Sequence, residues 1–220
     1  MRYPGLNALL SDPFAPVHGN KFVWKGFTYK VVVQDYGAGG KLAWLDRNLG
    51  ASRVATSLTD SNAYGDLYQW GRLADGHEKR TSGTTTTLAT TDTPGHGDFI
   101  ITSGDWRNPQ NNNLWQGADG INNPAPPGWR LPTEAELDAE RASWATQNAA
   151  GAFGSDLRFC YGGARLNNNA SFFSTNTNAF IMSSTTINLD ARRLFFSSSS
   201  ASIGTRNRGT AYSVRCVRTI

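Results

Sequence analysis

The sequence predicts a fold that mixes short β-strands with few helices and long ordered loops. Only 39% of its 220 residues are hydrophobic, and only 17% are charged. Gly, Ser, Thr and Asn fill the remainder and favour strands and turns over helices. Seven Trp, seven Tyr and eleven Phe nevertheless supply large buried areas, so we expect an aromatic-rich core. The length fits one large domain or two small ones.

Three segments in the first third of the chain are expected to be extended or packed inside. Residues 21–33, KFVWKGFTYKVVV, are rich in β-branched and aromatic residues, and Lys25-Gly26 is a plausible turn, so they predict a hairpin. Residues 41–50, KLAWLDRNLG, predict another strand. Residues 63–72, AYGDLYQWGR, place aromatic residues on both sides of small ones and predict a short helix or strand inside the protein.

The clearest helix signal follows residue 132. Thr133 is the expected N-cap, and Glu136, three residues later, completes a capping box. Leu137 and Trp144 recur at helical spacing and predict a buried stripe. Gly151 is the expected end of this helix.

The remaining segments are expected to be loops and short strands. Residues 73–127 predict a long irregular region, and such loops are usually functional or disordered. Trp106, Leu114 and Trp115 indicate that the second part of this region packs onto the core. Residues 157–220 predict short strands separated by polar turns.

Charge and composition exclude several classes of protein. The net charge of +4 is modest and, apart from a C-terminal group of arginines, scattered, so no nucleic-acid partner is expected. The first residues contain no long apolar run, so we expect neither a signal peptide nor membrane insertion. Residues 1–20 are expected to be an N-terminal extension of a single domain, 21–220, with the apolar residues 6–10 as a docking segment. A phage particle, the cytoplasm and a trimmed surface protein all stay open as locations.

No pattern indicates a catalytic site, a metal or a cofactor. Cys160 and Cys216 lack the spacing of a zinc site, and they either form a disulfide or lie buried as thiols. His18, His77 and His96 are expected to be ordinary loop residues, since no nucleophile-elbow pattern accompanies them.

Two groups of polar residues have a structural and a functional interpretation. Asp105, Asp119 and residues 111–113 are possible calcium ligands, but they lack an ordered acidic series, so a solvated loop is favoured. Asp46 and Arg47 are expected to form a buried pair or to cap backbone groups rather than to catalyse a reaction. The tryptophans expected in the core are Trp44, Trp70 and Trp129.

A known family shares three segments of this chain. WLDRNLGAS (44–52), GDLYQWGR (65–72) and GWRLPTEAEL (128–137), followed by YSVRCVR (212–218), together resemble the Fibrobacter succinogenes major paralogous domain. That domain is similar to the formylglycine-generating-enzyme branch of the C-type-lectin-like fold. The resemblance covers residues 41–218. It implies an α+β fold with small twisted antiparallel sheets, few helices, long ordered loops and neighbouring N and C termini.

Some members of this fold are variable proteins of diversity-generating retroelements. In these, a C-terminal segment is rewritten at chosen codons, mainly those for Asn, and displays a ligand-binding face. Residues 157–212 resemble such a segment. The resemblance implies a fixed frame at GGAR (162–165), SST (183–185), AR (191–192) and SVRC (213–216), with display positions between them.

The wider fold also includes an oxidase that makes formylglycine. In the enzymes of that branch, the chemistry needs a close pair of reactive cysteines near the C-terminal end. Cys160 and Cys216 are far apart in the sequence, and nothing nearby indicates a lowered thiol pKa. Related family members often carry a Cys where this chain has Ala125, so Cys216 lacks that partner, and Cys160 is the alternative.

The alternation of residues along 192–197 predicts which side chains are displayed. Leu194 and Phe196 share one face of a strand and suit packing, whereas Arg193 and Phe195 share the other. Exposed Phe and Arg on a rigid frame are typical of binding hot spots. The candidate ligand-binding residues are Leu166, Asn168, Phe173, Phe180, Ile187, Arg193, Phe195, Ser197, Ser202, Gly204, Arg206 and Thr210.

These observations predict a non-enzymatic binding protein whose C-terminal face takes a protein or glycan ligand. The oligomeric state stays open. Two alternatives remain: an enzyme of the formylglycine-generating branch, and a structural module whose polar C-terminal segment only completes the fold. Solvent exposure of Arg193 and Phe195 distinguishes the binding protein from the structural module.

Overall fold

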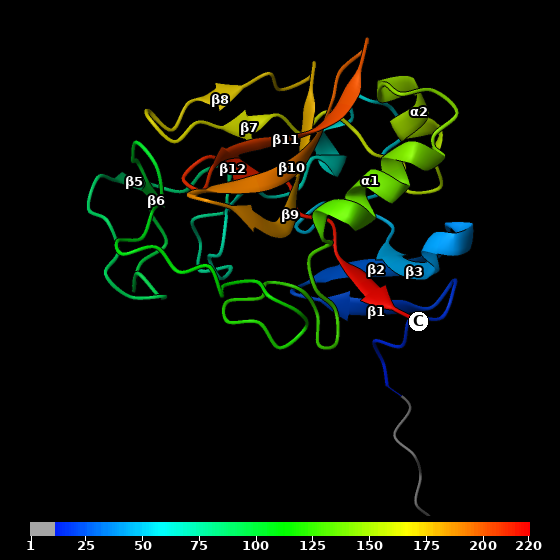
Figure 1. The fold of residues 1–220 in the computed structure, drawn as a ribbon, viewed down its shortest axis with the longest axis horizontal. Helices are drawn as coiled ribbons and strands as arrows, with labels where there is room; N and C mark the ends of the chain where they lie inside the picture. Colours follow the sequence, from blue (N-terminus) through cyan, green and yellow to red (C-terminus); the bar gives the residue numbers. More distant parts are fainter. Residues whose placement is uncertain (1–11) are drawn as a thin grey trace, which may run out of the picture.

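The computed structural model describes residues 12–220, which form three small antiparallel sheets, one parallel strand pair and two helices (Figure 1). The first sheet has the order β1-β2-β3-β13 and contains both ends of the described chain. Its strands are β1 (Lys21–Trp24), β2 (Phe27–Asp35), β3 (Lys41–Leu45) and β13 (Val217–Thr219). The expected hairpin is confirmed: Lys25 and Gly26 both have positive φ, as a two-residue turn of the primed type requires.

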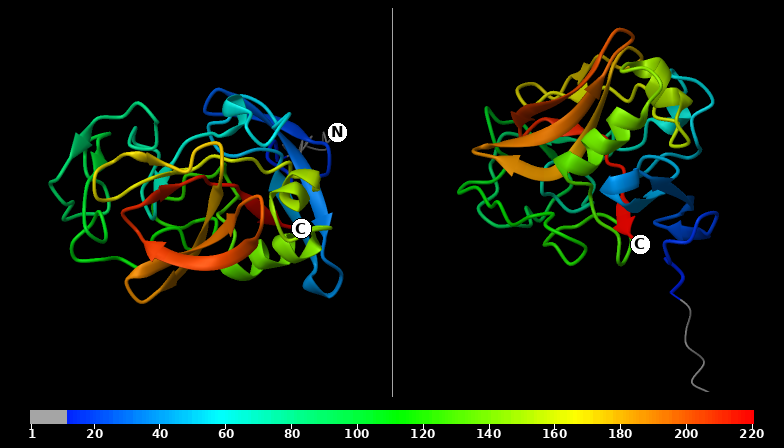
Figure 2. Two further views of the ribbon diagram at one scale, coloured as in Figure 1. Left: turned by 90° about the horizontal axis from the view of Figure 1, so that it is seen from above. Right: turned by 45° about the vertical axis from the view of Figure 1, so that its right-hand side comes forward.

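The second sheet consists of the consecutive strands β9 (Ala179–Ile187), β10 (Asp190–Phe196) and β11 (Ala201–Asn207). Helix α1 (Glu134–Ser143) lies between this sheet and the first one (Figures 1 and 2). One hydrophobic cluster joins the first sheet, helix α1 and the second sheet, since it contains Trp44 of β3, Leu137 of α1 and Leu194 of β10. The second sheet is therefore fixed to the body of the protein by one of its faces.

The third sheet has the order β4-β12-β7-β8, so strands far apart in the sequence become neighbours. Its strands are short: β4 (Tyr68–Gln69), β7 (Ala164–Arg165), β8 (Phe172–Phe173) and β12 (Ala211–Tyr212). A parallel pair, β5 (Thr84–Thr85) and β6 (Phe99–Ile100), lies within the long loop region. Two 3-10 turns cover Gly37–Gly39 and Ser61–Ala63.

Aromatic side chains fill the core, as expected from the composition. The largest buried cluster combines residues of all three antiparallel sheets with residues of the loops. The tryptophans predicted to be buried are 5% exposed or less: Trp44, Trp70, Trp106, Trp115, Trp129 and Trp144. Leu114 and the packed segment 63–72 are also buried, so the irregular region is held by its own apolar residues.

Helix α1 begins as predicted but ends early. The Thr133 hydroxyl accepts a hydrogen bond from the Glu136 backbone N–H, and the Glu136 carboxylate accepts one from the Thr133 backbone N–H, which completes the capping box. The end expected at Gly151 is wrong, because Trp144 is already extended with ψ 141°. A separate short helix, α2 (Ala149–Gly154), begins after Asn148, whose side chain caps it. A polar N-cap inside the predicted helix was the sequence signal for this break.

The boundary predicted at residue 20 is too late. Phe14 packs edge-on against Phe22 at 5.1 Å between ring centroids, and its carbonyl accepts hydrogen bonds from Trp129 and Arg218. Arg218 also forms an ion pair with Asp12 at 2.6 Å. Residues 12–20 thus belong to the domain and lie against its C-terminal strand, while the predicted docking segment, 6–10, lies outside the described residues.

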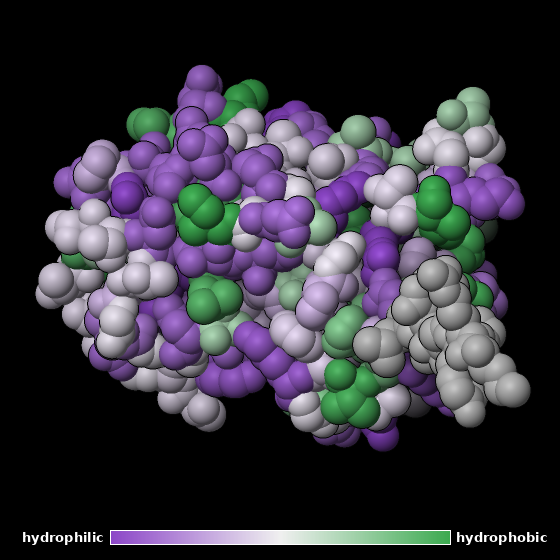
Figure 3. All heavy atoms as spheres, turned by 90° about the horizontal axis from the view of Figure 1, so that it is seen from below, coloured by the Kyte–Doolittle hydropathy of each residue, from purple (hydrophilic) through white to green (hydrophobic). Residues whose placement is uncertain are grey.

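The face seen in Figure 3 is mostly hydrophilic and carries only isolated hydrophobic side chains. Within residues 12–220, no helix is long and apolar enough to cross a membrane. The predicted α+β class, with small antiparallel sheets and few helices, is confirmed.

Candidate functional site

Strand β10 divides its side chains between two faces as the alternation predicted. Leu194 and Phe196 are fully buried against α1 and its neighbours. Arg193 and Phe195 lie on the opposite face and are half-buried. The predicted separation of faces is therefore confirmed, and the outer pair is neither fully exposed nor hidden.

Aromatic rings form a row across this outer face. Phe195 lies beside Phe180 of β9 at 5.4 Å between ring centroids, and Phe180 lies 6.5 Å from Phe173 of β8. Tyr212 of β12 packs beneath Phe180 at 5.2 Å. The row starts in the core and ends at Phe173, whose surface is 48% exposed. It provides an apolar surface on two adjoining sheets.

The guanidinium of Arg193 lies over these rings. Its Cζ atom is 4.8 Å from the Phe180 ring centroid, 5.5 Å from that of Tyr212 and 5.7 Å from that of Phe195. These distances are in the range of cation–π attraction. Nε and Nη1 of Arg193 are buried and have no hydrogen-bond partner within residues 12–220. Burial accordingly lowers the pKa of Arg193.

Strand β11 leaves this arginine uncovered by any side chain. In the β10–β11 register Gly204 is opposite Arg193, Ser202 is opposite Phe195, and Arg206 is opposite Ala191. A Cβ atom at Gly204 would lie 3.8 Å from Nη2 of Arg193, so any larger residue would cover the guanidinium. Ser202 and Arg206 are exposed on either side. We call Phe173, Phe180, Arg193, Phe195, Ser202, Gly204 and Arg206 the arginine–phenylalanine face.

Two predicted ligand-binding residues are buried, and their expected exposure is wrong. Phe180 is 5% exposed because Tyr212, Phe195 and the core enclose its ring. Thr210 is 1% exposed, and its hydroxyl makes hydrogen bonds with Asn167 and Asn207. Phe180 supports the arginine–phenylalanine face from below, whereas Thr210 fixes a turn.

The other predicted residues lie at separate places around this face. Leu166 is half-buried and Asn168 is exposed in the turn between β7 and β8. Ile187, 43% exposed, lies where β9 ends, whereas Ser197 follows β10 at the opposite end of the sheet and accepts a hydrogen bond from Ala149. A seven-residue strand separates these two ends by about 20 Å. Ile187 and Ser197 therefore do not belong to one compact patch.

The four stretches expected to form the fixed frame are largely buried. Gly162 to Arg165, Ser183, Ser184, Ala191 and residues 213–216 are all buried, while Thr185 and Arg192 are half-buried. Arg215 illustrates how the frame is held: it is 1% exposed and donates hydrogen bonds to Asn48, Leu45 and Leu157. These stretches support the strands that carry the arginine–phenylalanine face.

Asp75, His77 and Glu78 are the one group within residues 12–220 whose ligand atoms lie close enough for a metal, within 4.8 Å. Nε2 of the buried His77 accepts a hydrogen bond from the Gln69 backbone at 3.1 Å, so Nδ1 carries the proton and donates to Asp75 at 2.7 Å. Neither nitrogen has a free lone pair for a metal ion. Burial lowers the pKa of His77 and keeps the ring neutral. The group is a structural hydrogen-bond network.

The polar loop that contains the possible calcium ligands Asp105 and 111–113 is held by an arginine. Arg208 is fully buried, lies 3.5 Å from Asp105 and donates a hydrogen bond to Asn112 at 2.6 Å. A cation therefore already neutralises Asp105. Asp46 and Arg47 form the expected pair, with two hydrogen bonds near 3 Å and Asp46 5% exposed.

The two cysteines are free buried thiols. They lie in different hydrophobic clusters, Cys160 beside Tyr64 and Cys216 in the main core. Burial raises the pKa of Cys160 to about 11 and raises that of Cys216 further above its usual range. The possible disulfide is not formed, and neither thiol is activated as a nucleophile.

Tyr212 is the member of this site that sequence reasoning missed. It belongs to the two-residue strand β12, which lies between Thr210 and the SVRC stretch (213–216). No local sequence pattern places its ring under Arg193. Comparison with family models, with curated proteins and with solved structures finds no match to this chain.

Proposed function

We propose that this chain is a non-enzymatic ligand-binding protein, in which a C-type-lectin-like scaffold displays the arginine–phenylalanine face to a protein or glycan. The segment 157–212 is the diversified part of a retroelement variable protein in this proposal. The scaffold assignment is supported by the family-like segments 44–52, 65–72 and 128–137, whose tryptophans are all buried in the core.

The state of Arg193 is the observation that carries the proposal. A half-buried guanidinium with two unpartnered N–H groups reduces stability, because each buried unsatisfied donor costs about 1–3 kcal/mol. Buried polar groups normally have a partner, and an acceptor from a ligand would supply one for this guanidinium. Carboxylates, main-chain carbonyls and sugar hydroxyls are suitable acceptors for a guanidinium.

The surroundings of Arg193 fit a binding hot spot. The exposed half of Phe173, the half-buried Phe195 and the exposed Arg206 provide apolar and cationic contacts around it. Arg and aromatic residues are the types that dominate interface energetics. The opposite face of the same sheet is buried on α1, so the display surface is rigid and loses little entropy on binding.

The enzyme alternative has less support. An oxidase of the formylglycine-generating branch would need two reactive thiols close together. Cys160 and Cys216 are buried in separate clusters, with raised pKa values. The structural-module alternative predicts that the outer side chains of β10 are covered, yet Arg193 and Phe195 keep half-buried positions beside the exposed β11.

A binding assay with matched variants tests the proposal. Labelled protein is applied to a glycan array and to intact bacterial cells, and the bound signal is compared between variants. Phe173→Ala and Phe195→Ser should each weaken binding about tenfold or more, as hot-spot truncations do. Phe172→Ala is the control, because Phe172 is equally exposed at 48% but lies on the other side of β8, against Arg80 and Arg165.

The control also defines the contrary result. If the variants of the arginine–phenylalanine face bind as the unmodified protein does while Phe172→Ala does not, the binding surface is on the other side of the β7–β8 hairpin. If the labelled protein binds to no glycan on the array and to no bacterial cell, the structural-module alternative is preferred.

A further inference from the structure

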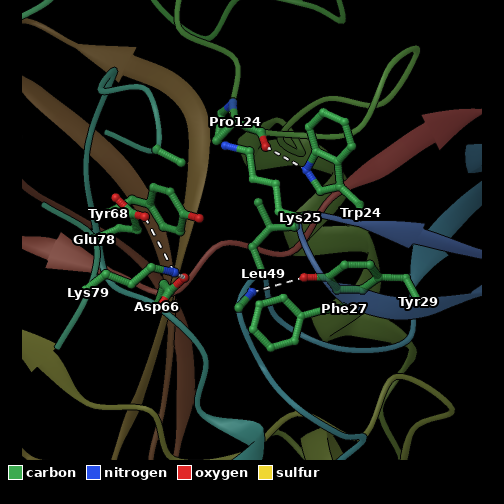
Figure 4. Close-up of a pocket in the computed structure, with 12 residues that line it drawn as sticks. Trp24, Lys25, Phe27, Tyr29, Leu49, Asp66, Tyr68, Glu78, Lys79 and Pro124 are labelled. Carbon is green, nitrogen blue, oxygen red and sulfur yellow. Dashed lines mark hydrogen bonds and ion pairs between the residues drawn. The ribbon is translucent and has the colours of Figure 1, made fainter. Parts of the chain in front are cut away.

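A second hollow lies away from the arginine–phenylalanine face, between the β1–β2 hairpin and the loops around β4 (Figure 4). Its volume is about 240 Å³, below the range of about 300–1,000 Å³ usual for drug-sized ligands. The residues that line it come from four separated segments, near 24–29, 49–50, 66–79 and 124. A ligand of one ring with its substituents fits this size.

The walls of the hollow are aromatic. Trp24 and Phe27 are half-buried at the ends of the hairpin strands, and Trp24 is held by a hydrogen bond from its Nε1 to the Pro124 carbonyl at 3.4 Å. Tyr29 and Tyr68 are 1% and 3% exposed and form the deeper wall. Aromatic faces carry negative potential and attract the slightly positive C–H groups of an aliphatic ring.

One hydroxyl on the wall of the hollow has no hydrogen-bond partner in the described part of the protein. Tyr68 is held by edge-on contacts with His77 and Trp115, and its hydroxyl makes no hydrogen bond within residues 12–220. Figure 4 shows this hydroxyl directed toward the open centre of the hollow. The Tyr29 hydroxyl accepts a hydrogen bond from the Gly50 backbone at 3.0 Å, so its own proton is also available. Both hydroxyls can therefore donate to acceptors of a molecule that occupies the hollow.

Acceptors and positive charge are present on the same wall. Asp66 lines the hollow and is 9% exposed; one of its oxygens accepts a hydrogen bond from Lys79 at 2.7 Å, and the other makes no hydrogen bond within residues 12–220. Glu78 lies 3.6 Å from the same lysine. With Lys25 at the rim, two acids face two lysines, so the lining is formally neutral. A charged ligand would meet no excess of opposite charge here.

We infer that this hollow binds a single neutral sugar ring. A sugar ring offers hydroxyls that both donate and accept, which matches the Tyr68 hydroxyl and the Asp66 carboxylate on one side and the Tyr29 hydroxyl on the other (Figure 4). Its C–H face packs against Trp24 and Phe27. The site is separate from the arginine–phenylalanine face, so the inference does not rest on the proposed function.

The test uses the whole protein and defined probes. Saturation-transfer NMR is recorded with D-glucose, D-galactose, D-mannose, L-fucose, D-xylose and N-acetyl-D-glucosamine, each at about 10 mM, with choline and acetate as charged comparators. At least one sugar should show a saturation-transfer signal, and choline and acetate should show none. The Tyr68→Phe variant should bind that sugar about 3- to 10-fold more weakly, since it loses one hydrogen bond.

Tyr161→Phe is the matched control. Tyr161 is 7% exposed, makes no hydrogen bond through its hydroxyl within the described part of the chain and lies in the cluster around α1. The Tyr161→Phe variant should bind the sugar with the affinity of the unmodified protein. Absence of saturation for all six sugars, binding of choline or acetate instead, or equal affinities of Tyr68→Phe and Tyr161→Phe would each overturn the inference.

Discussion

Replacing Arg193 by methionine should make the protein more stable and less able to bind. Arg193 has two buried nitrogens, Nε and Nη1, without hydrogen-bond partners, and they cost about 2–6 kcal/mol together if each costs about 1–3. Its position over three rings returns about 0.5–1 kcal/mol per ring. Methionine keeps the volume and makes sulfur–aromatic contacts worth about 0.3–1.5 kcal/mol.

The expected net effect of Arg193→Met, from the middle of these ranges, is a gain of about 2–3 kcal/mol in the free energy of unfolding. For a chain of this length each kcal/mol shifts Tm by about 2–4 °C, so Tm should rise by about 4–12 °C. Urea denaturation followed by tryptophan fluorescence gives the free energy, and calorimetry gives Tm. The same variant should lose binding in the array and cell assays.

Arg192→Met provides the comparison. Arg192 is the neighbouring residue on the other face of β10; its Nη2 is paired with Glu134 of α1, and only its Nε is buried without a partner. Its replacement removes an ion pair worth at most about 1 kcal/mol together with one unpartnered nitrogen, so stability should rise by less than in Arg193→Met. If Arg193→Met instead lowers stability by more than about 1 kcal/mol, Arg193 stabilises the fold and the reasoning that assigns it to a ligand is refuted.

Three further predictions concern the frame that holds the site. Thr133→Ala should lower the free energy of unfolding by about 1 kcal/mol, because the Glu136 N–H loses its capping acceptor; an unchanged urea midpoint would contradict the role of the cap. The free energy of unfolding should fall as the pH decreases below about 6.5. Burial lowers the pKa of His77 in the folded state, so the unfolded chain takes up the proton first. The His77→Gln variant should show a weaker pH dependence between about pH 7 and 5 in chemical denaturation. Cys160 and Cys216 should react with a thiol reagent at pH 8 only after denaturation, and rapid labelling of the native protein would show that one of them is accessible.

Local sequence patterns predicted the elements whose signals are local. The primed turn at Lys25-Gly26, the capping box at Thr133 and the two faces of β10 each depend on residues a few positions apart, and each is present. The end of α1 was placed too late because Leu137 and Trp144 continue the helical spacing, although Trp144 is already extended.

Burial on the outer face of the second sheet could not be predicted in this way. Alternation shows which residues share a face, but it does not show which part of that face another sheet covers. Phe180 is buried because Tyr212, 32 positions away, lies against its ring, and Thr210 is buried by hydrogen bonds to two asparagines. These contacts depend on the crossing of β12 between β4 and β7.

The hollow beside the hairpin had no sequence signal for the same reason. Trp24, Gly50, Tyr68 and Pro124 belong to four segments that meet only when the first and third sheets pack together. The aromatic residues of 63–72 were correctly expected inside the protein. Their burial alone did not indicate that the Tyr68 hydroxyl would remain without a partner.

Sequencing the DNA downstream of the gene tests the central claim most directly. The account predicts a near-copy of the codons for residues 157–216 beside a reverse transcriptase. The copy should differ mainly at its adenines, and the differing codons should encode outer residues such as Phe173, Arg193 and Ser202 rather than the buried Leu194 and Phe196. A locus with neither copy nor reverse transcriptase, or a copy whose differences fall on the buried positions, would contradict a diversified binding face.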